Sequence, residues 1–340
     1  MIKLNVYVLF FLNINSICSA YNNVELESNF INYLFKYDKS YNTQEEFKYR
    51  YNIYSNNLKK IEDHNSLNKP YKFAVNQFTD MLPHEFNEHK GFIHDVNMDI
   101  ISLLKKFSNK GHVSCNIFES NQELELPDSI DWRDYNAVSN VKNQGRCGSC
   151  WSFSSTGAIE GAWAIKNSLV NISEQQLIDC SRSYGDLGCH GGIMDNAFSY
   201  AIDNGMCSEL AYPYDAKGHL CKNCNKTVFI SSCTDVTPMN QLHLKEAVAK
   251  GPVSVAIEAD KTIFQSYSSG VITSDNCGTD LDHGVLIVGY GIEDDIPYWL
   301  VKNSWGVSWG DNGYVKIARS DDTDNEGVCG IAMQASYVSV

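Results

Sequence analysis

The chain contains the run Gln144-Gly-Arg-Cys-Gly-Ser-Cys150-Trp-Ser-Phe153. The residues from Cys150 to about Asn167 are rich in Trp, Phe, Ala and Ile and lack proline, which predicts a buried helix that begins at the second thiol. A thiol at this place can be a nucleophile, half of a redox pair or a metal ligand. The N-terminus of a helix lowers the pKa of a thiol, so a nucleophile is one use that the position favours.

Composition indicates a folded, exported protein. The 340 residues are 43% hydrophobic and carry a net charge of −14, which makes the chain a poor binder of nucleic acids or anionic membranes. Residues 1–20 are typical of a signal peptide, with Lys3, an apolar run from Val6 to Leu12, and small residues up to Ala20. A membrane anchor is the alternative, but that run is well below the ~20 residues needed to span a bilayer. We expect no membrane span and a route through the secretory pathway, where the 12 cysteines can pair.

The composition changes near residue 126. Residues 21–125 contain a single cysteine, Cys115, whereas all six tryptophans lie after residue 126. This change predicts an N-terminal region over 21–125 and a main domain over 126–340. The stretch from Gly91 to Asn121 has a weak pattern and is predicted to be a linker.

One face of a long helix is predicted in the N-terminal region. Its residues recur at steps of three and four and mix polar with apolar groups, which favours a partner surface or a buried polar network over an ordinary amphipathic helix. The first two members stand four residues apart, so we expect them to form an ion pair. The face consists of Glu46, Arg50, Ile53, Tyr54, Asn57, Ile61 and Asn65.

The main domain divides into a helical half, about 126–235, and a strand-rich half, about 236–340. Ser173 to Gln176 reads as a capping box that starts a second helix, and a third helix is expected from Asp195 to Asn204, closed by Gly205. This order predicts an α+β protein with two lobes and a cleft between them. In the second half we expect a helix over Leu242–Lys250 and strands over Val253–Ala259, Gly284–Tyr290, Tyr298–Lys302 and Gly313–Ala318.

Five residues form a candidate set for nucleophilic catalysis. Cys150 would attack as a thiolate, and His283 opens a predicted strand where an imidazole could take the thiol proton. Asn303 ends another strand and could orient that imidazole, with Trp305 shielding the hydrogen bond from water. The Gln144 amide and the Cys150 backbone N–H are candidate donors to a developing oxyanion. Each residue alone has an ordinary structural explanation, so the prediction of a catalytic site depends on the combination of all five.

The chain resembles the papain family of cysteine proteases, and within it the cathepsin L type. Cys147-Gly-Ser-Cys150-Trp is the family signature. Two pro-region motifs also match, with Tyr54 where Phe is usual and Ala74 where Gly is usual. The resemblance covers nearly the whole chain from about residue 28. Further matching blocks are Leu126–Arg133, Gly188–Gly192, Asp282–Gly284 and Asn303–Gly306.

The resemblance implies a papain-like fold and a peptidase mechanism. The fold would be a helical lobe and a β-barrel-like lobe, preceded by a helical inhibitory propeptide over 21–125. Cys150 would be the nucleophile, His283 the general base and acid, Asn303 the residue that orients it, and Gln144 part of the oxyanion hole. Substrate would contact Gly191, Gly192, Ile193, Met194, Ala256, Leu281, Asp282, Gly284, Trp305 and Gln334.

The same resemblance implies an endopeptidase made as a zymogen. The loop between Cys180 and Cys189 is short and lacks the His-His insertion of cathepsin B-like exopeptidases. Acid should loosen the propeptide and allow a cut near Glu125-Leu126. We expect protein and peptide substrates, inhibition by the propeptide and by cystatin-type proteins, no cofactor or metal, a monomer, and a lysosome-like or extracellular destination.

The cysteines leave alternatives open. The family pattern suggests the pairs Cys147–Cys189, Cys180–Cys221 and Cys277–Cys329, and Cys207 could bridge to Cys224 or Cys233. A dithiol oxidoreductase using Cys147 and Cys150, and a zinc site built from Cys207, Cys221, Cys224 and Cys233, are the rival interpretations. Two glycosylation acceptors are predicted, Asn171 and Asn225.

Overall fold

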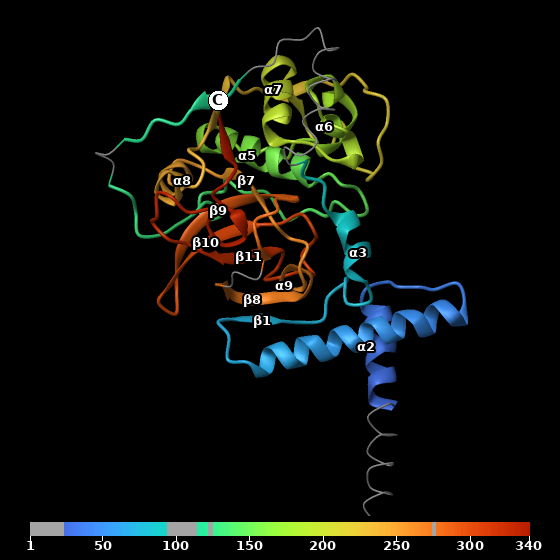
Figure 1. Ribbon diagram of the computed structural model, residues 1–340. Helices are drawn as coiled ribbons and strands as arrows, with labels where there is room; N and C mark the ends of the chain where they lie inside the picture. The colour runs from blue at the N-terminus through green and yellow to red at the C-terminus, as the bar shows by residue number, and fades with distance from the viewer. Residues whose placement is uncertain (1–23, 94–113, 122–124, 274–276) are drawn as a thin grey trace, which may run out of the picture.

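The computed structural model describes residues 24–93, 114–121, 125–273 and 277–340. Figure 1 shows a helical lobe packed on a strand-rich lobe, with the N-terminal helices at the far end of the molecule from the helical lobe. The predicted signal peptide lies outside the described residues. Within them, no helix has the length and apolar character needed to cross a membrane.

Three helices build the helical lobe: α5 (Cys150–Lys166), α6 (Glu174–Cys180) and α7 (Met194–Asn204). The Ser173 side chain accepts the N–H of Gln176 and caps α6. Helix α7 ends at Gly205, whose φ of 67° favours glycine. All three helices were predicted from the sequence, and the structure confirms them.

The strand-rich lobe is organised around one ten-stranded sheet, mostly antiparallel. The predicted strands correspond to β7, β9, β10 and β11, and the predicted short helix is α8 (Gln241–Val248). Strand β3 (Ile130–Asp131) pairs with β9 beside the main path. The order along that path is β1 (Tyr71–Phe73), β8 (Tyr267–Ile272), β11 (Tyr314–Ala318), β10 (Ile296–Lys302), β9 (His283–Glu293), β7 (Val253–Ile257), β12 (Ala335–Ser339), β6 (Ser232–Asp235) and β2 (Asn116–Ile117).

Several elements were missed by the sequence analysis. They include β1, β2, β6, β8 and β12 of the large sheet, the short helix α9 (Thr262–Ser266), and the pair β4 (Met206–Cys207) and β5 (Lys226–Val228) in the helical lobe. Most are five residues or fewer, and several carry polar side chains. Such segments form because neighbouring strands or helices hold them, so local periodicity does not reveal them.

Helix α5 joins the two lobes. It packs against β9, where the Ser154 hydroxyl donates to the Val285 carbonyl at 2.6 Å, and the Ser254 hydroxyl of β7 donates to the Ser154 carbonyl at 2.9 Å. Gly157 is in close contact with Leu286, and a β-carbon there would lie 2.7 Å from it. This close packing places the start of α5 beside the start of β9.

The N-terminal region contains two crossing helices, residues 24–36 and α2 (Gln44–Ser66) (Figure 1). Their shared core includes Phe30, Tyr33 and Tyr54. The mixed face of α2 is a buried polar network, as predicted: the Asn57 amide donates to two backbone carbonyls, of Thr79 and Met81.

The expected ion pair between Glu46 and Arg50 is wrong. The Glu46 carboxylate instead accepts the backbone N–H of Asn42 at 3.1 Å and so closes the N-terminus of α2. Arg50 makes a two-pronged ion pair with Glu85, at 2.7 and 2.8 Å. A planar guanidinium matches a carboxylate best in this side-by-side geometry, and the unsatisfied helix terminus offers Glu46 a better use.

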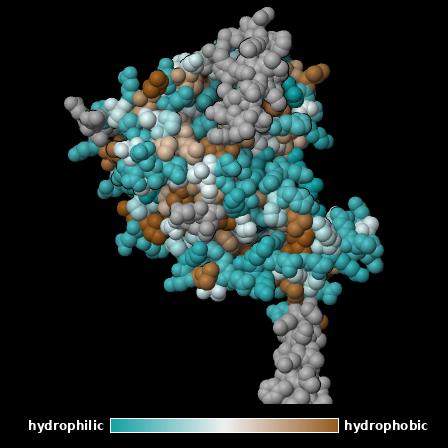
Figure 2. Space-filling model, viewed as in Figure 1, coloured by the Kyte–Doolittle hydropathy of each residue, from teal (hydrophilic) through white to brown (hydrophobic). Residues whose placement is uncertain are grey.

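The N-terminal region docks on the strand-rich lobe. Strand β1 extends the sheet at β8, and the rings of Phe78 and Phe86 stand edge-on to Trp305, with centroids 5.7 and 5.0 Å away. Asn76 donates to the Gln265 carbonyl at 2.7 Å. Phe78, Phe86 and Trp305 are all buried, so these aromatic contacts are internal to the molecule, whereas the face shown in Figure 2 is mostly hydrophilic.

Five disulfides are present among the described residues, and Cys150 is the free cysteine there. Three are the expected pairs, Cys147–Cys189, Cys180–Cys221 and Cys277–Cys329. The other two are Cys207–Cys224, one of the two options for Cys207, and Cys115–Cys233.

The predicted linker over Gly91–Asn121 is wrong at both described ends. Residues 91–93 lie in the cleft, and residues 114–121 include β2 of the large sheet. Both ends are held by backbone hydrogen bonds to the main domain. Backbone hydrogen bonds do not depend on side-chain type, so they leave no periodic pattern in the sequence.

Candidate active site

Cys150 is the first residue of α5 and is fully buried. Its Sγ accepts the backbone N–H of Gly284 at 3.3 Å, so it lies next to the start of β9. Burial raises the pKa of the thiol to about 12, although the N–H groups of Gly284, Gly91 and Trp151 act in the opposite direction. In this closed form the thiol is therefore protonated.

His283 opens β9 and is also fully buried. Its Nε2 lies 2.8 Å from Oδ1 of Asn303, and the Trp305 ring stacks on the imidazole at 4.5 Å between centroids. Its Nδ1 has no hydrogen-bond partner among the described residues. Burial lowers the pKa of His283 to about 3, so the imidazole is neutral, with Nε2 carrying the proton toward Asn303 and Nδ1 able to accept one.

Gln144 is held rigidly beside Cys150. Its Nε2 donates to the Cys147 carbonyl at 2.9 Å, and its Oε1 accepts the Ser304 hydroxyl at 2.6 Å. One N–H of this amide remains for another acceptor. The N–H of Cys150 belongs to the first turn of α5 and has no acceptor within the helix. The two donors predicted for an oxyanion thus belong to one local unit.

Gly191 and Gly192 form one wall of the cleft. Gly191 has a φ of +118°, and a β-carbon on Gly192 would lie 2.5 Å from the Trp151 ring, so both positions require glycine. The disulfide Cys147–Cys189 ties this wall to the loop before α5. The backbone of Gly192 is therefore presented to whatever lies in the cleft.

Residues 90–93 of the N-terminal region occupy the cleft. The N–H of Gly192 donates to the Gly91 carbonyl at 3.0 Å, the N–H of Ile93 donates to the Gly192 carbonyl at 3.2 Å, and the N–H of Phe92 donates to the Asp282 carbonyl at 3.1 Å. A β-carbon on Gly91 would lie 2.0 Å from the Gly148 carbonyl oxygen. The segment fills the space directly in front of the thiol.

An ion pair fixes the start of this segment. Lys90 Nζ lies 2.5 Å from Asp282 Oδ2, in the residue before His283. Burial raises the pKa of Asp282, and the Lys90 ammonium opposes that shift. The sequence analysis assigned Asp282 to the cleft but did not predict Lys90 as its partner.

Several of the predicted subsite residues lie in the same buried apolar cluster as Phe92. Phe92 belongs to the same buried cluster as Met194, Ala256 and Leu281, and Ile193 is partly buried against it. Gly284 lies against both Met194 and Trp151. Gln334 is half-buried at this site, and its carbonyl accepts the N–H of Ala256 at 3.1 Å.

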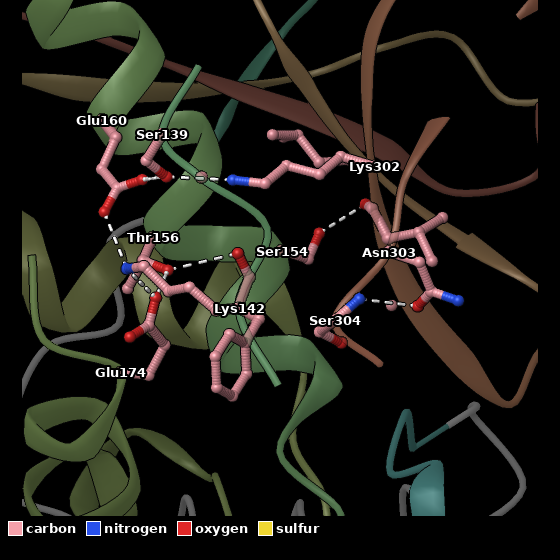
Figure 3. Close-up of a pocket in the computed structure, with 14 residues that line it drawn as sticks. Ser139, Lys142, Ser154, Thr156, Glu160, Glu174, Lys302, Asn303 and Ser304 are labelled. Carbon is pink, nitrogen blue, oxygen red and sulfur yellow. Dashed lines mark hydrogen bonds and ion pairs between the residues drawn. The ribbon is translucent and has the colours of Figure 1, made fainter. Parts of the chain in front are cut away.

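A buried ion network lines a pocket that Asn303 and Ser304 also line (Figure 3), and the sequence analysis did not predict it. Lys142 lies 3.0 Å from Glu160 and 2.6 Å from Glu174, and although burial disfavours its ammonium, the two carboxylates raise the pKa of Lys142. Lys302 donates to Ser139, and burial lowers the pKa of Lys302 to about 8. Lysines and glutamates are usually exposed, so nothing in the linear pattern marked these as internal.

Metal chemistry has little support in the described residues. The four cysteines of the zinc interpretation all lie in disulfides, which overturns it. The one group there with metal-like spacing is Cys115, Asp195 and Asp235, and its sulfur is already bridged.

Comparison with known proteins agrees with this geometry. Residues 126–339 match the model of the papain family cysteine protease domain, and residues 30–86 match the cathepsin propeptide inhibitor domain. Cathepsin L of Sarcophaga peregrina is 42% identical over 91% of this chain and 91% of its own length. Cathepsin L1 of Drosophila melanogaster is 44% identical over 88% of this chain and 81% of its own.

Solved structures agree as well. Digestive procathepsin L2 proteinase from the larval midgut of Tenebrio molitor superposes with a TM-score of 0.82 at 38% identity, covering 93% of this chain and 100% of that one. Procathepsin L 3 from the same tissue gives 0.80 at 39% identity, covering 93% and 99%.

The chain therefore belongs to the papain family of cysteine proteases. Within that family it is a cathepsin L-type protease joined to its propeptide inhibitor domain, and so a zymogen. The oxidoreductase interpretation is not supported, because Cys147 is bridged to Cys189 and Cys150 stands free.

Proposed function

We propose that this protein is an acid-activated cysteine endopeptidase that cleaves peptide bonds through an acyl-enzyme intermediate. The observation that carries the proposal is a free thiol at the start of α5 beside an imidazole whose Nδ1 is unpartnered and whose Nε2 is held by Asn303. Cys150, His283, Asn303 and Gln144 are its catalytic group.

The reaction follows from these positions. His283 Nδ1 takes the proton of the Cys150 thiol, and the thiolate attacks the substrate carbonyl. The free N–H of Gln144 and the Cys150 backbone N–H stabilise the resulting oxyanion. The imidazolium then protonates the leaving amine, and a water activated by His283 hydrolyses the thioester.

The propeptide keeps this pair neutral in the zymogen. Residues 90–93 exclude water, and desolvation disfavours both the thiolate and the imidazolium. When the segment leaves, water and substrate enter, and the ion pair becomes favourable. Activation is thus both the opening of the cleft and the charging of the catalytic pair.

The main specificity subsite accepts a bulky apolar side chain two residues before the cleaved bond. Phe92 of the propeptide already occupies an apolar environment shared with Met194, Ala256 and Leu281. We expect Leu, Phe or Val to be preferred there, with Gln334 extending tolerance toward polar or basic side chains. A peptide library that favours acidic residues at this position would contradict the assignment.

Labelling with an electrophilic peptide tests the proposed function. The acid-treated protein should bind one label at Cys150, located by mass mapping, whereas the intact zymogen at neutral pH should bind little. A Cys150→Ala variant should bind none. Labelling of a different cysteine in the acid-treated enzyme would overturn the proposal.

We further propose that the chain is a monomer that travels the secretory pathway to a lysosome-like compartment or the exterior, that its signal peptide spans residues 1–20, and that cystatin-type inhibitors bind its cleft. Its disulfides and protease class support such a route. Asn171 and Asn225 are both exposed, as glycan acceptors must be. Enzymatic removal of N-glycans from protein made in secreting cells should lower its mass.

A further inference from the structure

Residues 114–121 dock on the main domain far from the cleft. Strand β2 pairs in parallel with β6, with Asn116 opposite Thr234, and the N–H of Phe118 donates to the Asp235 carbonyl at 3.0 Å. Figure 1 shows β2 beside the C-terminus, at the end of the molecule opposite α2. The segment therefore extends the edge of the large sheet.

Side chains reinforce this docking. Phe118 is only 5% exposed, and it packs against His243 of α8 at 5.2 Å between ring centroids. Beyond it, the Ser120 hydroxyl and the Asn121 N–H donate to the two oxygens of the Glu246 carboxylate, at 2.8 and 2.9 Å. The segment has a strand contact, an apolar anchor and a polar clamp.

The disulfide Cys115–Cys233 makes the docking covalent. Cys233 is 1% exposed and lies in β6, within the main domain. Cys115 lies before the expected maturation cut at Glu125-Leu126. The bridge therefore crosses the boundary between the propeptide and the mature enzyme.

The inhibitory contacts are separate from this surface. Residues 90–93 contact Gly192 and Asp282, and residues 71–86 contact β8 and Trp305, whereas residues 114–121 contact β6 and α8. Release of the inhibitor and release of residues 114–121 are thus different events.

We propose that the surface formed by β6 and α8 keeps residues 114–121 on the active enzyme as a disulfide-linked second chain. This inference rests on the proposed function for the maturation cut. A cut at Glu125-Leu126 alone leaves the whole inhibitor tethered through Cys115, at the high effective concentration of a linked partner. Full activity then needs a second cut before Cys115, or reduction of the bridge.

Intact mass under reducing and non-reducing conditions tests this inference. The oxidised zymogen is acidified without reductant, labelled with the electrophilic peptide and weighed. We expect the mass of the labelled enzyme to exceed that of the labelled chain from about residue 126 alone. The difference should equal the mass of a peptide that contains Cys115. Dithiothreitol should release that peptide completely, reducing the bridge to two thiols as the dithiol closes to its cyclic disulfide. Labelled enzyme that lacks the peptide before reduction would overturn the proposal.

Two matched variants separate the covalent link from the docking. A Cys115→Ser/Cys233→Ser double variant retains Phe118 and the Glu246 clamp, but should lose the peptide under denaturing, non-reducing conditions. A Phe118→Ala variant should keep it under the same conditions. Loss from both variants alike would contradict a role for the bridge.

A further arm is independent of the protein's own activity. The Cys150→Ala zymogen can be cut with a Glu-specific endoprotease, which cleaves after the exposed Glu125. The chain that begins at Leu126 should retain the Cys115 peptide until reduction. If the peptide is absent before reduction, the inference is wrong. If the cut variant retains the Cys115 peptide but wild-type Cys150 is not labelled, the proposed function is overturned and the disulfide-linked chain is not.

Discussion

In the proposed mechanism, single side chains around Cys150 have separate roles. Trp305 stacks on His283 beside its bond to Asn303, and the Gln144 amide is held at its oxygen by Ser304 and at its nitrogen by the Cys147 carbonyl. These contacts fix the orientation of groups whose chemistry depends on direction. Small changes in them should alter rate more than binding.

Removal of the Gln144 amide should slow the reaction. In Gln144→Ala, we expect kcat to fall about 10²–10³-fold with little change in KM, as for the loss of one oxyanion donor. Steady-state kinetics on a fluorogenic peptide measures this. The thermal unfolding midpoint serves as a control, because Gln144 also bonds Cys147 and Ser304. A large rise in KM with unchanged kcat would argue against the oxyanion role.

Removal of His283 should abolish most turnover. In His283→Ala, kcat is expected to drop by at least 10²–10⁴-fold, the usual contribution of a general acid–base group. Asn303→Ala should give a smaller loss, because the ring keeps its place against Trp305. Equal losses in both variants would mean that Asn303 does more than orient the ring.

At the scale of elements, the cleft segment and helix α2 set how the zymogen opens. Gly91 fits against Gly148 with no room for a side chain. Farther away, Arg50 of α2 pairs with Glu85 of the short helix α3 (Pro83–Phe86). This close contact adds to the hydrogen bonds and the ion pair that hold residues 90–93, and the Arg50–Glu85 pair ties α2 to the chain that leads to them.

Gly91→Ala should weaken the block. The added β-carbon would lie 2.0 Å from the Gly148 oxygen, so the segment must shift out of the cleft. We expect higher peptidase activity of the intact zymogen at neutral pH, measured with a fluorogenic peptide. Once the part of the propeptide that contains residue 91 has been removed, kcat/KM should equal wild type. Unchanged zymogen activity would show that the close contact is not needed for inhibition.

The pH of activation should depend on Glu85. Burial raises the pKa of Glu85, but Arg50 and the Leu82 N–H outweigh it, and the net pKa is lowered from its usual value near 4.5. The stabilisation is thus present above the ordinary carboxyl range and is lost as pH falls through the lowered pKa. Glu85→Gln removes it at every pH, so processing should begin at a less acidic pH.

The onset of processing is measured by gel shift across a pH series. The exposed Glu88→Gln is the matched control and should process like wild type. If the pH dependence of processing is unchanged in Glu85→Gln, protonation of other carboxylates, such as Asp282, must start the processing instead.

At the scale of the whole molecule, the network of Lys142, Glu160 and Glu174 joins distant parts of the chain. Lys142→Met would leave two buried carboxylates without a cation, and breaking such a group costs about 3–5 kcal/mol. We expect a clearly lower free energy of unfolding by denaturant titration. Lys245→Met is the control, since its partner Asp321 is 55% exposed and exposed pairs contribute about 0–1 kcal/mol. Equal effects would contradict a structural role for the network.

Local patterns determined much of this protein. The helices from Cys150, Ser173 and Asp195 follow from caps and apolar content, and the proposed catalytic set Cys150, His283 and Asn303 was identifiable by residue type and strand position. Each of these features is marked by a local motif, which a sequence displays directly, although the sequence does not show that Cys150 and His283 meet.

The tertiary structure alone decided the rest. It paired Arg50 with Glu85, buried Lys142 among acids, placed Phe92 in a buried apolar cluster of the main domain, and joined Cys115 to Cys233. These contacts join residues far apart along the chain, and their energies depend on burial and mutual geometry. The sequence lists the groups, but only the fold brings them within reach and removes the water between them.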